Sequence, residues 1–174
     1  MSEFQTMGVI AELMAIAART APKAGGKDFV ELKVLRGETL EQLAAAMTSY
    51  GQESGKKNFD RDGDNVRRSD AVLLVGLKNA AITGLDCGAC GVARCADLEQ
   101  LHNGPEFAGP ICAWRLIDLG IALGSAAKMA GMLNADNRIM YRIGVVARRM
   151  GLMDADVIAG IPIAATGKNI YFDR

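Results

Sequence analysis

The chain has 174 residues, of which 50% are apolar and 23% are charged, a balance that supplies a buried core and argues against disorder. Its 20 basic and 20 acidic side chains cancel, so the net charge gives no electrostatic reason to expect nucleic acid or an anionic membrane as a partner. The opening residues MSEFQT lack the basic segment of a signal peptide, and charged residues interrupt the long apolar stretches, so we expect a cytoplasmic protein without a membrane span.

The N-terminal part of the chain predicts a helix followed by a strand. Apolar residues at helical spacing predict a helix over 7–21. A second apolar face, formed by Val9, Leu13 and Ile16, predicts that this helix is buried on both sides. Residues 29–35 alternate apolar and charged side chains, which predicts a half-buried strand.

The next segment predicts a helix, a turn and a covered strand. Thr39 and Gln42 have the spacing of a capping box and predict the start of a helix. Residues 60–65 (DRDGDN) imitate the start of a calcium-binding loop but lack its glycine and its final glutamate, so we expect a solvated turn. The continuous apolar run at 71–77 predicts a strand in the middle of a covered sheet.

The C-terminal part predicts two helices and a last strand. Residues 111–133 predict a long helix, apolar around most of its circumference and therefore central. Asp136 predicts the N-cap of the following helix, and residues 156–165 predict the strand. The interleaving of helices and strands predicts a single α/β or α+β domain with helices packed over a sheet.

All four cysteines of the chain fall within the segment 84–112, at the spacing C-x2-C-x4-C-x16-C. They are Cys87, Cys90, Cys95 and Cys112. In a reducing cytosol, clustered cysteines indicate metal or redox chemistry before structural disulfides. The Gly and Ala residues between the first three let the backbone fold tightly and direct amide N–H groups at sulfur, as iron–sulfur clusters require.

The fourth cysteine has a helical context of its own. Gly109-Pro110 predicts a helix start at the proline, which places Cys112 in the first turn, where the helix dipole favours a thiolate. Arg94 and Arg115 are candidates to offset charge at the site.

Three kinds of site remain open for these thiols. A [4Fe-4S] cluster fits four cysteines, three local and one remote. A structural zinc site uses the same four thiolates, although zinc ribbons usually have two separated C-x2-C pairs. The third option is a dithiol at Cys87 and Cys90, or cysteines that are buried without a ligand. His102, the single histidine, is expected at the surface.

Several segments carry a resemblance to known families. AARTAPKAGGKDFV (17–30) and VIAGIPIAATGKNIYFDR (157–174) resemble a helix-to-strand segment and the final strand of FMN-dependent nitroreductases. IDLGIALGSAAKMA (117–130) is similar to their long central helix. Together with LDCGACG and DNRIMYRIG, the whole chain resembles a family of prokaryotic ferredoxin domain-containing proteins, a small cysteine-bearing relative of the nitroreductase fold.

The resemblance implies an α+β fold over 1–174, with helices packed around a mixed, mainly antiparallel sheet and a long central helix. It also implies an iron–sulfur redox protein that passes electrons to a partner protein or to a small-molecule acceptor. The alternatives are an FMN-dependent oxidoreductase and a non-catalytic domain with a four-cysteine zinc site.

The nitroreductase resemblance further implies candidate flavin contacts and an assembly. If FMN is bound, Arg19 and Lys168 are the candidates for its phosphate, with Lys23 as a further basic group. A homodimer formed through the long helices is also implied.

Overall fold

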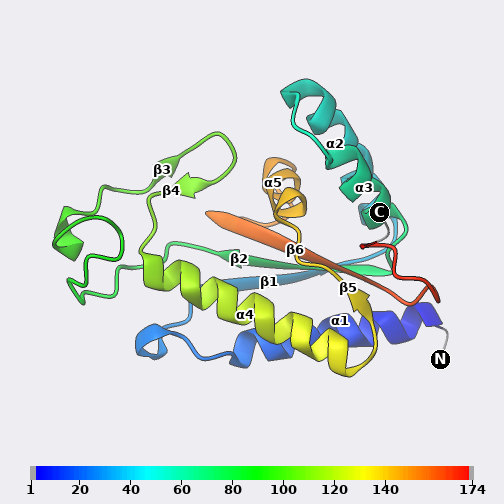
Figure 1. Cartoon of the computed structure of the whole chain (residues 1–174), viewed down its shortest axis with the longest axis horizontal. Coiled ribbons are helices and arrows are strands. Elements are labelled where there is room, and N and C mark those ends of the chain that lie inside the picture. Colours follow the sequence, from blue (N-terminus) through cyan, green and yellow to red (C-terminus); the bar gives the residue numbers. More distant parts are fainter. Residues whose placement is uncertain (1–2, 173–174) are drawn as a thin grey trace.

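A four-stranded sheet lies in the middle of the fold (Figure 1). The computed structural model describes residues 3–172. The strands lie in the order β1-β2-β6-β5 and pair antiparallel, with bounds β1 (Val30–Leu35), β2 (Ala71–Leu77), β5 (Asp136–Asn137) and β6 (Val157–Ala164). The three predicted strands are confirmed to within one residue at each end. The α+β class is confirmed, with a sheet that is antiparallel at each of these pairings.

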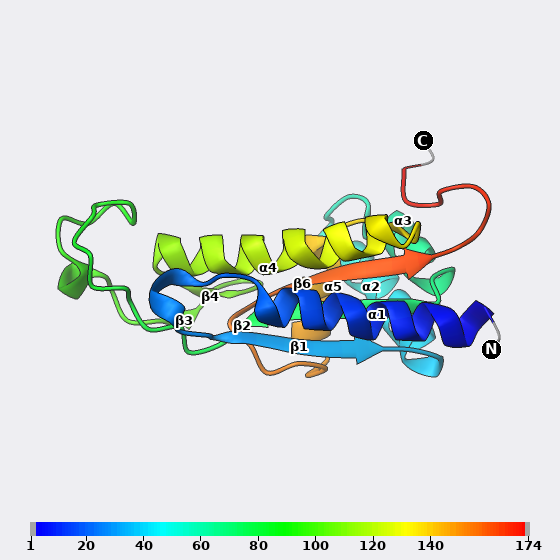
Figure 2. The same ribbon diagram turned by 90° about the horizontal axis from the view of Figure 1, so that it is seen from below.

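Helices cover both faces of this sheet (Figures 1 and 2). One layer consists of α1 (Glu3–Thr20) and α4 (Ala113–Met132), and the other of α2 (Glu38–Ser54), α3 (Phe59–Arg67) and α5 (Tyr141–Arg149). Because side chains alternate along a strand, Leu73 and Val75 of β2 pack under the first layer, and Val72 and Leu74 pack under the second. Every residue of β2 is buried, as predicted for the middle of a covered sheet.

The segment that joins β2 to α4 extends from one end of the molecule (Figure 1). It contains a short two-stranded sheet of β3 (His102–Asn103) and β4 (Ala108–Gly109), and a turn of 3₁₀ helix, η2 (Cys95–Asp97). A second such turn, η1 (Ala24–Gly26), follows α1. The long helix predicted at 111–133 is confirmed as α4, and Pro110 lies before it rather than in its first turn.

Two glycines let α5 pack directly on β6. A Cβ placed on Gly144 would lie 1.7 Å from the carbonyl oxygen of Ile158, and one on Gly160 would lie 2.2 Å from Cγ2 of Ile143. Such distances are far inside van der Waals contact, so only glycine allows the helix and the strand to approach this closely.

The turn predicted at 60–65 is wrong, because these residues form the middle of α3. Phe59 and Val66, seven residues apart, are fully buried on the inner side of this helix. Asp62 is also buried, and its carboxylate accepts hydrogen bonds from Arg61 and Arg142. Tertiary packing therefore supports a helix in a sequence that reads locally as a polar turn.

Two predicted helix caps are also wrong. The helix expected near Thr39 does form, but it begins at Glu38 after Gly37, and Gln42 donates to the Glu38 carboxylate rather than to the backbone. Asp136 lies in β5 instead of capping a helix, and its carboxylate accepts a hydrogen bond from the side chain of Asn169. Gln42 therefore makes a contact within its own helix, whereas Asp136 is engaged by a segment distant in the sequence.

Within the part of the chain that the structure describes, the layer of α1 and α4 has an apolar side that no other element covers. The prediction that α1 is buried on both sides is wrong for a single chain, because the sheet and α4 cover only one of its faces. We call the uncovered surface the α1–α4 outer face; its exposed apolar residues are Val9, Leu13, Ile16, Leu116, Ile117 and Ile121. Within residues 3–172, no helix has both the length and the apolar character needed to span a membrane.

Candidate functional site

The four cysteines lie together at the end of the molecule that carries the extended segment. Cys87, Cys90, Cys95 and Cys112 all line one narrow cavity, and none of them is in a disulfide. The first three come from the loop after β2, and Cys112 is the N-cap residue of α4. Ile82 and Leu98 contribute apolar walls. The structure therefore brings together the four thiols that the sequence singled out.

The sulfurs border a shared space rather than a single point. Among residues 3–172, no three Cys, His, Asp or Glu side chains are gathered closely enough to hold one metal ion. His102 lies in β3, is exposed and contacts the carbonyl oxygen of Gln100, as expected for a surface residue.

Two of the thiols accept hydrogen bonds from backbone N–H groups. The Ala113 N–H donates to Sγ of Cys90 at 3.1 Å, and the Asp86 N–H donates to Sγ of Cys95 at 3.3 Å. The second contact is reciprocal, because the Cys95 N–H donates to Oδ1 of Asp86 at 2.6 Å. Asp86 has a φ of 47°, a left-handed conformation that asparagine and aspartate tolerate better than most residues. These contacts hold the loop around its own sulfurs.

The other two thiols contact side chains. The indole Nε1–H of Trp114 donates to Sγ of Cys87 at 3.3 Å, and the Thr83 hydroxyl lies 3.6 Å from Sγ of Cys112. N–H and O–H donors at sulfur stabilise negative charge there, which is how proteins accommodate thiolates and iron–sulfur clusters.

The thiol of Cys112 is buried at the start of α4 and is strongly perturbed there. Burial raises the pKa of its thiol, but hydrogen bonds from Thr83 and from the backbone N–H groups of Trp114 and Arg115 outweigh this effect and lower the pKa from 9.0 to about 7. At neutral pH a large fraction of this thiol is therefore thiolate, the form that binds metals. The pKa of Cys87 is also lowered, by hydrogen bonds from the Ala89 backbone and from Trp114.

A buried ion pair fixes the start of α4 beside these thiols. The Arg115 guanidinium donates to Oδ2 of Asp118 at 3.0 Å, and both side chains are almost completely buried. It also donates to the carbonyl oxygens of Ala81 and Ala24, at 2.8 and 2.9 Å. Asp118 accepts a hydrogen bond from the Ala24 N–H at 2.7 Å. Arg115 therefore joins three segments, and its charge is directed at Asp118 rather than at the sulfurs.

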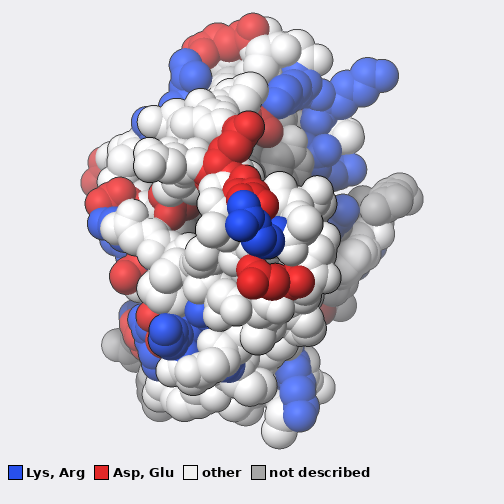
Figure 3. Space-filling model, turned by 90° about the vertical axis from the view of Figure 1, so that its left-hand side faces the viewer, with Lys and Arg blue, Asp and Glu red and all other residues white. Residues whose placement is uncertain are grey.

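The charged residues of the cysteine loop are few. Arg94, the other candidate to offset charge at the site, pairs with the neighbouring Asp97 at 2.8 Å and is exposed. Figure 3 looks onto this end of the molecule, and uncharged residues make up most of the visible surface. Exposed apolar side chains of this region include Ile82, Leu85 and Leu101.

A second cavity adjoins the cysteines. It has a volume of about 420 Å³ and borders both Cys95 and Cys112. Its walls include apolar residues and two carboxylates; the residues are Ile82, Leu98, Leu101, Ile111, Glu99 and Asp156. A small molecule in this cavity would lie directly beside two of the thiols.

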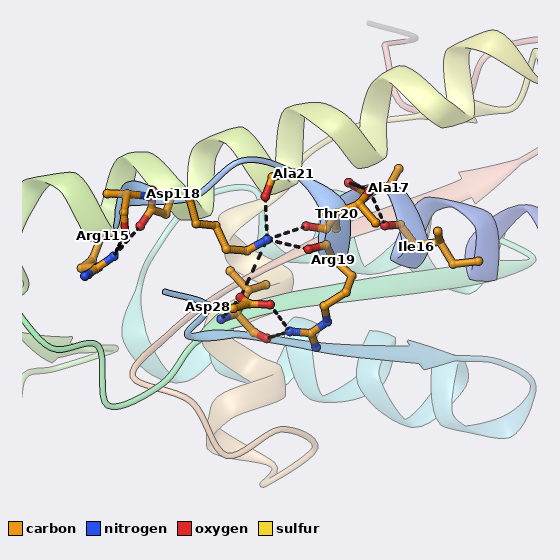
Figure 4. Close-up of polar contacts among 12 residues, drawn as sticks. Ile16, Ala17, Arg19, Thr20, Ala21, Asp28, Arg115 and Asp118 are labelled. Atoms are coloured by element: carbon orange, nitrogen blue, oxygen red, sulfur yellow. Dashed lines mark hydrogen bonds and ion pairs between the residues drawn. The ribbon is translucent and has the colours of Figure 1, made fainter. Parts of the chain in front are cut away.

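Two of the three candidate flavin contacts are engaged within the chain. Arg19 donates to the Asp28 carboxylate at 2.7 Å and to the Val30 carbonyl oxygen at 2.6 Å (Figure 4). The Lys23 ammonium donates to the carbonyl oxygens of Arg19 and Ala21, at 2.7 and 2.8 Å, where α1 ends. Positive charge at this end of a helix is favourable because the last carbonyl groups lack partners.

Lys168 lies elsewhere. It belongs to the segment that follows β6, and this segment leaves the sheet at the end of the molecule where α1 begins (Figures 1 and 2), whereas Arg19 is in the last turn of α1 and Lys23 follows that helix. A single chain therefore does not gather the three basic residues into one phosphate site.

Three residues that hydrogen-bond to cysteine sulfurs were not identified from the sequence; they are Thr83, Asp86 and Trp114. Asp86 precedes a cysteine in a glycine-rich loop, and Trp114 is the single tryptophan of the chain, just after Cys112. Closeness to a cysteine in the sequence was therefore a weak indication that Asp86 and Trp114 belong to the site. Thr83 lies 29 residues from Cys112, so no local pattern joins the two.

The chain is similar to a described family and to a full-length relative. The profile of a family described as "Uncharacterized protein containing a ferredoxin domain" matches residues 108–174, a span that includes Cys112. A protein of Archaeoglobus fulgidus, described as an uncharacterized protein, is 48% identical over 175 residues, which is 99% of this chain and 95% of that protein.

Similar solved structures are nitroreductases. A nitroreductase family protein from Clostridium novyi NT has a TM-score of 0.58 at 13% identity, covering 93% of this chain and 77% of its own. The nitroreductase CinD from Lactococcus lactis, in complex with nicotinic acid, has a TM-score of 0.58 at 14% identity, covering 95% and 84%. A nitroreductase with bound FMN from Desulfitobacterium hafniense DCB-2 has a TM-score of 0.55 at 14% identity, covering 95% and 82%. At such identities the likeness shows the fold, so the predicted nitroreductase-like fold is confirmed.

Replacing Asp118 with Ala should lower the free energy of unfolding by about 3–5 kcal/mol, because the Arg115 guanidinium would stay buried without its counter-ion. Chemical denaturation of the wild type and the variant measures this loss. Glu53→Ala is the matched control, since it breaks the exposed Arg149–Glu53 pair and should cost at most about 1 kcal/mol. Equally small losses in the two variants would contradict a structural role for the buried pair.

Proposed function

Because the chain belongs to the family of proteins described as containing a ferredoxin domain, we propose that it is an electron-transfer protein whose four cysteines hold a [4Fe-4S] cluster. The ligands would be Cys87, Cys90, Cys95 and Cys112. The observation that carries the proposal is that all four line one cavity and each sulfur has a hydrogen-bond partner within the chain. Four thiolates are the usual ligand set of such a cluster.

The donor set around the cavity fits a negatively charged iron–sulfur group. When bound, the cluster supplies a centre that accepts and releases electrons. The protein supplies thiolate ligands, donors that offset their charge, and apolar walls formed by Ile82 and Leu98. In the reducing cytoplasm, where we place the protein, free thiols are available to bind iron.

The position of the site at one end of the molecule suits exchange of electrons with an outside partner. The largely uncharged surface in Figure 3 suits contact with a redox partner protein. The cavity beside Cys95 and Cys112 suits a small-molecule acceptor. Both kinds of partner can approach from the same end of the molecule.

Anaerobic reconstitution with iron and sulfide should give a protein with a broad visible absorbance, and with iron and acid-labile sulfide in equal amounts. Cys87→Ala should lose most of the bound iron, because it removes one ligand at an exposed position that the fold does not need. His102→Ala is the matched control; it removes the histidine that lies between Cys95 and Cys112 in the sequence, and should keep the full iron content.

The same measurements separate the cluster from a structural zinc site. Stoichiometric zinc in freshly prepared protein, with no iron bound after reconstitution, would refute the electron-transfer function. It would indicate instead a structural zinc site that joins the loop to α4. Retention of iron by Cys87→Ala would remove that cysteine from the ligand set.

A flavin oxidoreductase is the second candidate function. Its support is the nitroreductase-like fold, since one of the similar structures contains FMN. Arg19 and Lys23 are already paired with Asp28 and with the end of α1, so the phosphate contacts carried over from the resemblance do not fit a site within one chain. We therefore place the flavin second.

Excess FMN should leave the melting temperature of the protein unchanged, because Arg19 and Lys23 already have partners within the chain. Differential scanning fluorimetry or calorimetry measures this. A melting temperature that rises with FMN concentration, and no longer rises in Lys168→Ala, would favour the flavin enzyme, since a ligand stabilises the folded state to which it binds.

We further expect the α1–α4 outer face to form a homodimer. Six exposed apolar side chains on the two helices of one layer suit burial against a second copy. Gly120 and Gly124 of α4 have open space beside them, so another backbone can approach this helix closely.

The double variant Leu13→Glu, Ile117→Glu should convert a dimer into a monomer, because it places four carboxylates in the shared interface. Sedimentation or light scattering measures the molar mass. Met150→Glu, at an exposed apolar position outside this face, is the control and should keep the mass of the wild type. A wild-type protein that remains monomeric at high concentration would refute the dimer.

A further inference from the structure

The first turn of α4 touches three of the four thiols. Cys112 is its N-cap residue, the Ala113 N–H donates to Cys90 at 3.1 Å, and the Trp114 indole N–H donates to Cys87 at 3.3 Å. One short stretch of backbone therefore sets where three sulfurs lie relative to one another.

This turn is held in place by the residue that follows Trp114. Arg115, the next residue, is buried in its contacts with Asp118, Ala24 and Ala81. Helical geometry then fixes the backbone of Trp114, and its ring projects toward the cysteine loop, where the indole N–H can only donate. The direction of the Trp114–Cys87 contact is thus set by a rigid element rather than by the loop.

The hydroxyl of Thr83, which also lines the cavity, makes a matching contact to Cys112. It lies 3.6 Å from Sγ of Cys112, within the longer range of hydrogen bonds to sulfur. Once Cys112 is a thiolate it has no proton to give, so the Thr83 hydroxyl must be the donor. Thr83 and Trp114 are the two side chains that donate to sulfur among the hydrogen bonds described above; the other two donors are backbone groups.

We infer that Trp114 and Thr83 are positioning residues that hold the Cys87 and Cys112 sulfurs and raise the reduction potential of the bound cluster. This inference rests on the proposed function. A reduced cluster carries one more negative charge than an oxidised one, and donors to its sulfur ligands stabilise the reduced form more. Removal of either donor therefore shifts the potential to a more negative value, while all four ligands remain in place.

The test compares the reconstituted wild type with Trp114→Phe and Thr83→Val, which keep the ring and the branched shape but remove the donor. Iron and sulfide contents are measured first, and the midpoint potential is then measured by an optical redox titration. We expect full iron content and about a tenfold shift of the reduction equilibrium toward the oxidised form in each variant, which is about 59 mV for one electron. The double variant should show approximately the sum of the two shifts.

Two further variants act as controls. Thr83→Ser keeps the hydroxyl and should restore the wild-type potential. Met132→Ala removes an exposed apolar side chain at the far end of the same helix, outside the α1–α4 outer face, and should leave the potential unchanged.

The outcomes distinguish this inference from the proposed function. Fully loaded variants with unchanged potentials would overturn the roles of Trp114 and Thr83 and leave the cluster in place. A wild type that binds no iron under the same conditions would overturn the proposed function and this inference together. If Trp114→Phe alone binds no iron, the potentials of Thr83→Val and Thr83→Ser are compared instead. Equal potentials in these two variants would refute hydrogen-bond donation by the Thr83 hydroxyl.

Discussion

The burial of the Arg115 guanidinium is the constraint on which the geometry of the cysteine site depends. A buried guanidinium needs acceptors in its own plane, and here they come from Asp118 of the same helix and from Ala24 and Ala81, which are distant in the sequence. None of these segments can move away without leaving a charge or a carbonyl group unpaired. The first turn of α4, which contacts three sulfurs, is therefore held in place before any group is bound.

The cysteine loop itself has much less support. Most of its residues are exposed, and its shape depends on left-handed residues such as Gly88 and Asp86 and on the reciprocal contact between Asp86 and Cys95. A loop with so few buried apolar contacts gains stability when its thiols bind a common group, because ligand binding and loop ordering are coupled. The cysteine site therefore has a rigid half on α4 and an adaptable half on the loop. This arrangement suits a site into which a cluster has to be inserted.

The fold is that of nitroreductases, yet the residues that the resemblance assigns to a flavin phosphate have structural partners here. Arg19 pairs with Asp28, and Lys23 satisfies carbonyl groups at the end of α1. A shared fold does not carry its chemistry with it, since function belongs to the site and not to the scaffold. The cysteine loop, which extends from the sheet, is the feature that gives this scaffold a candidate site of its own.

Local patterns in the sequence determined the buried strand at 71–77, the long helix near 111–133 and the set of four thiols, because hydrophobic period and residue type act over a few neighbouring residues. Tertiary structure alone decided that 60–65 is helical, that only one face of α1 is covered within a chain, and that Arg115 pairs with Asp118 rather than serving the sulfurs. It also decided which donors meet the thiols, as Thr83 and Cys112 are brought together by the return of the chain to α4. Such contacts depend on how distant segments pack, and no local period in the sequence records that.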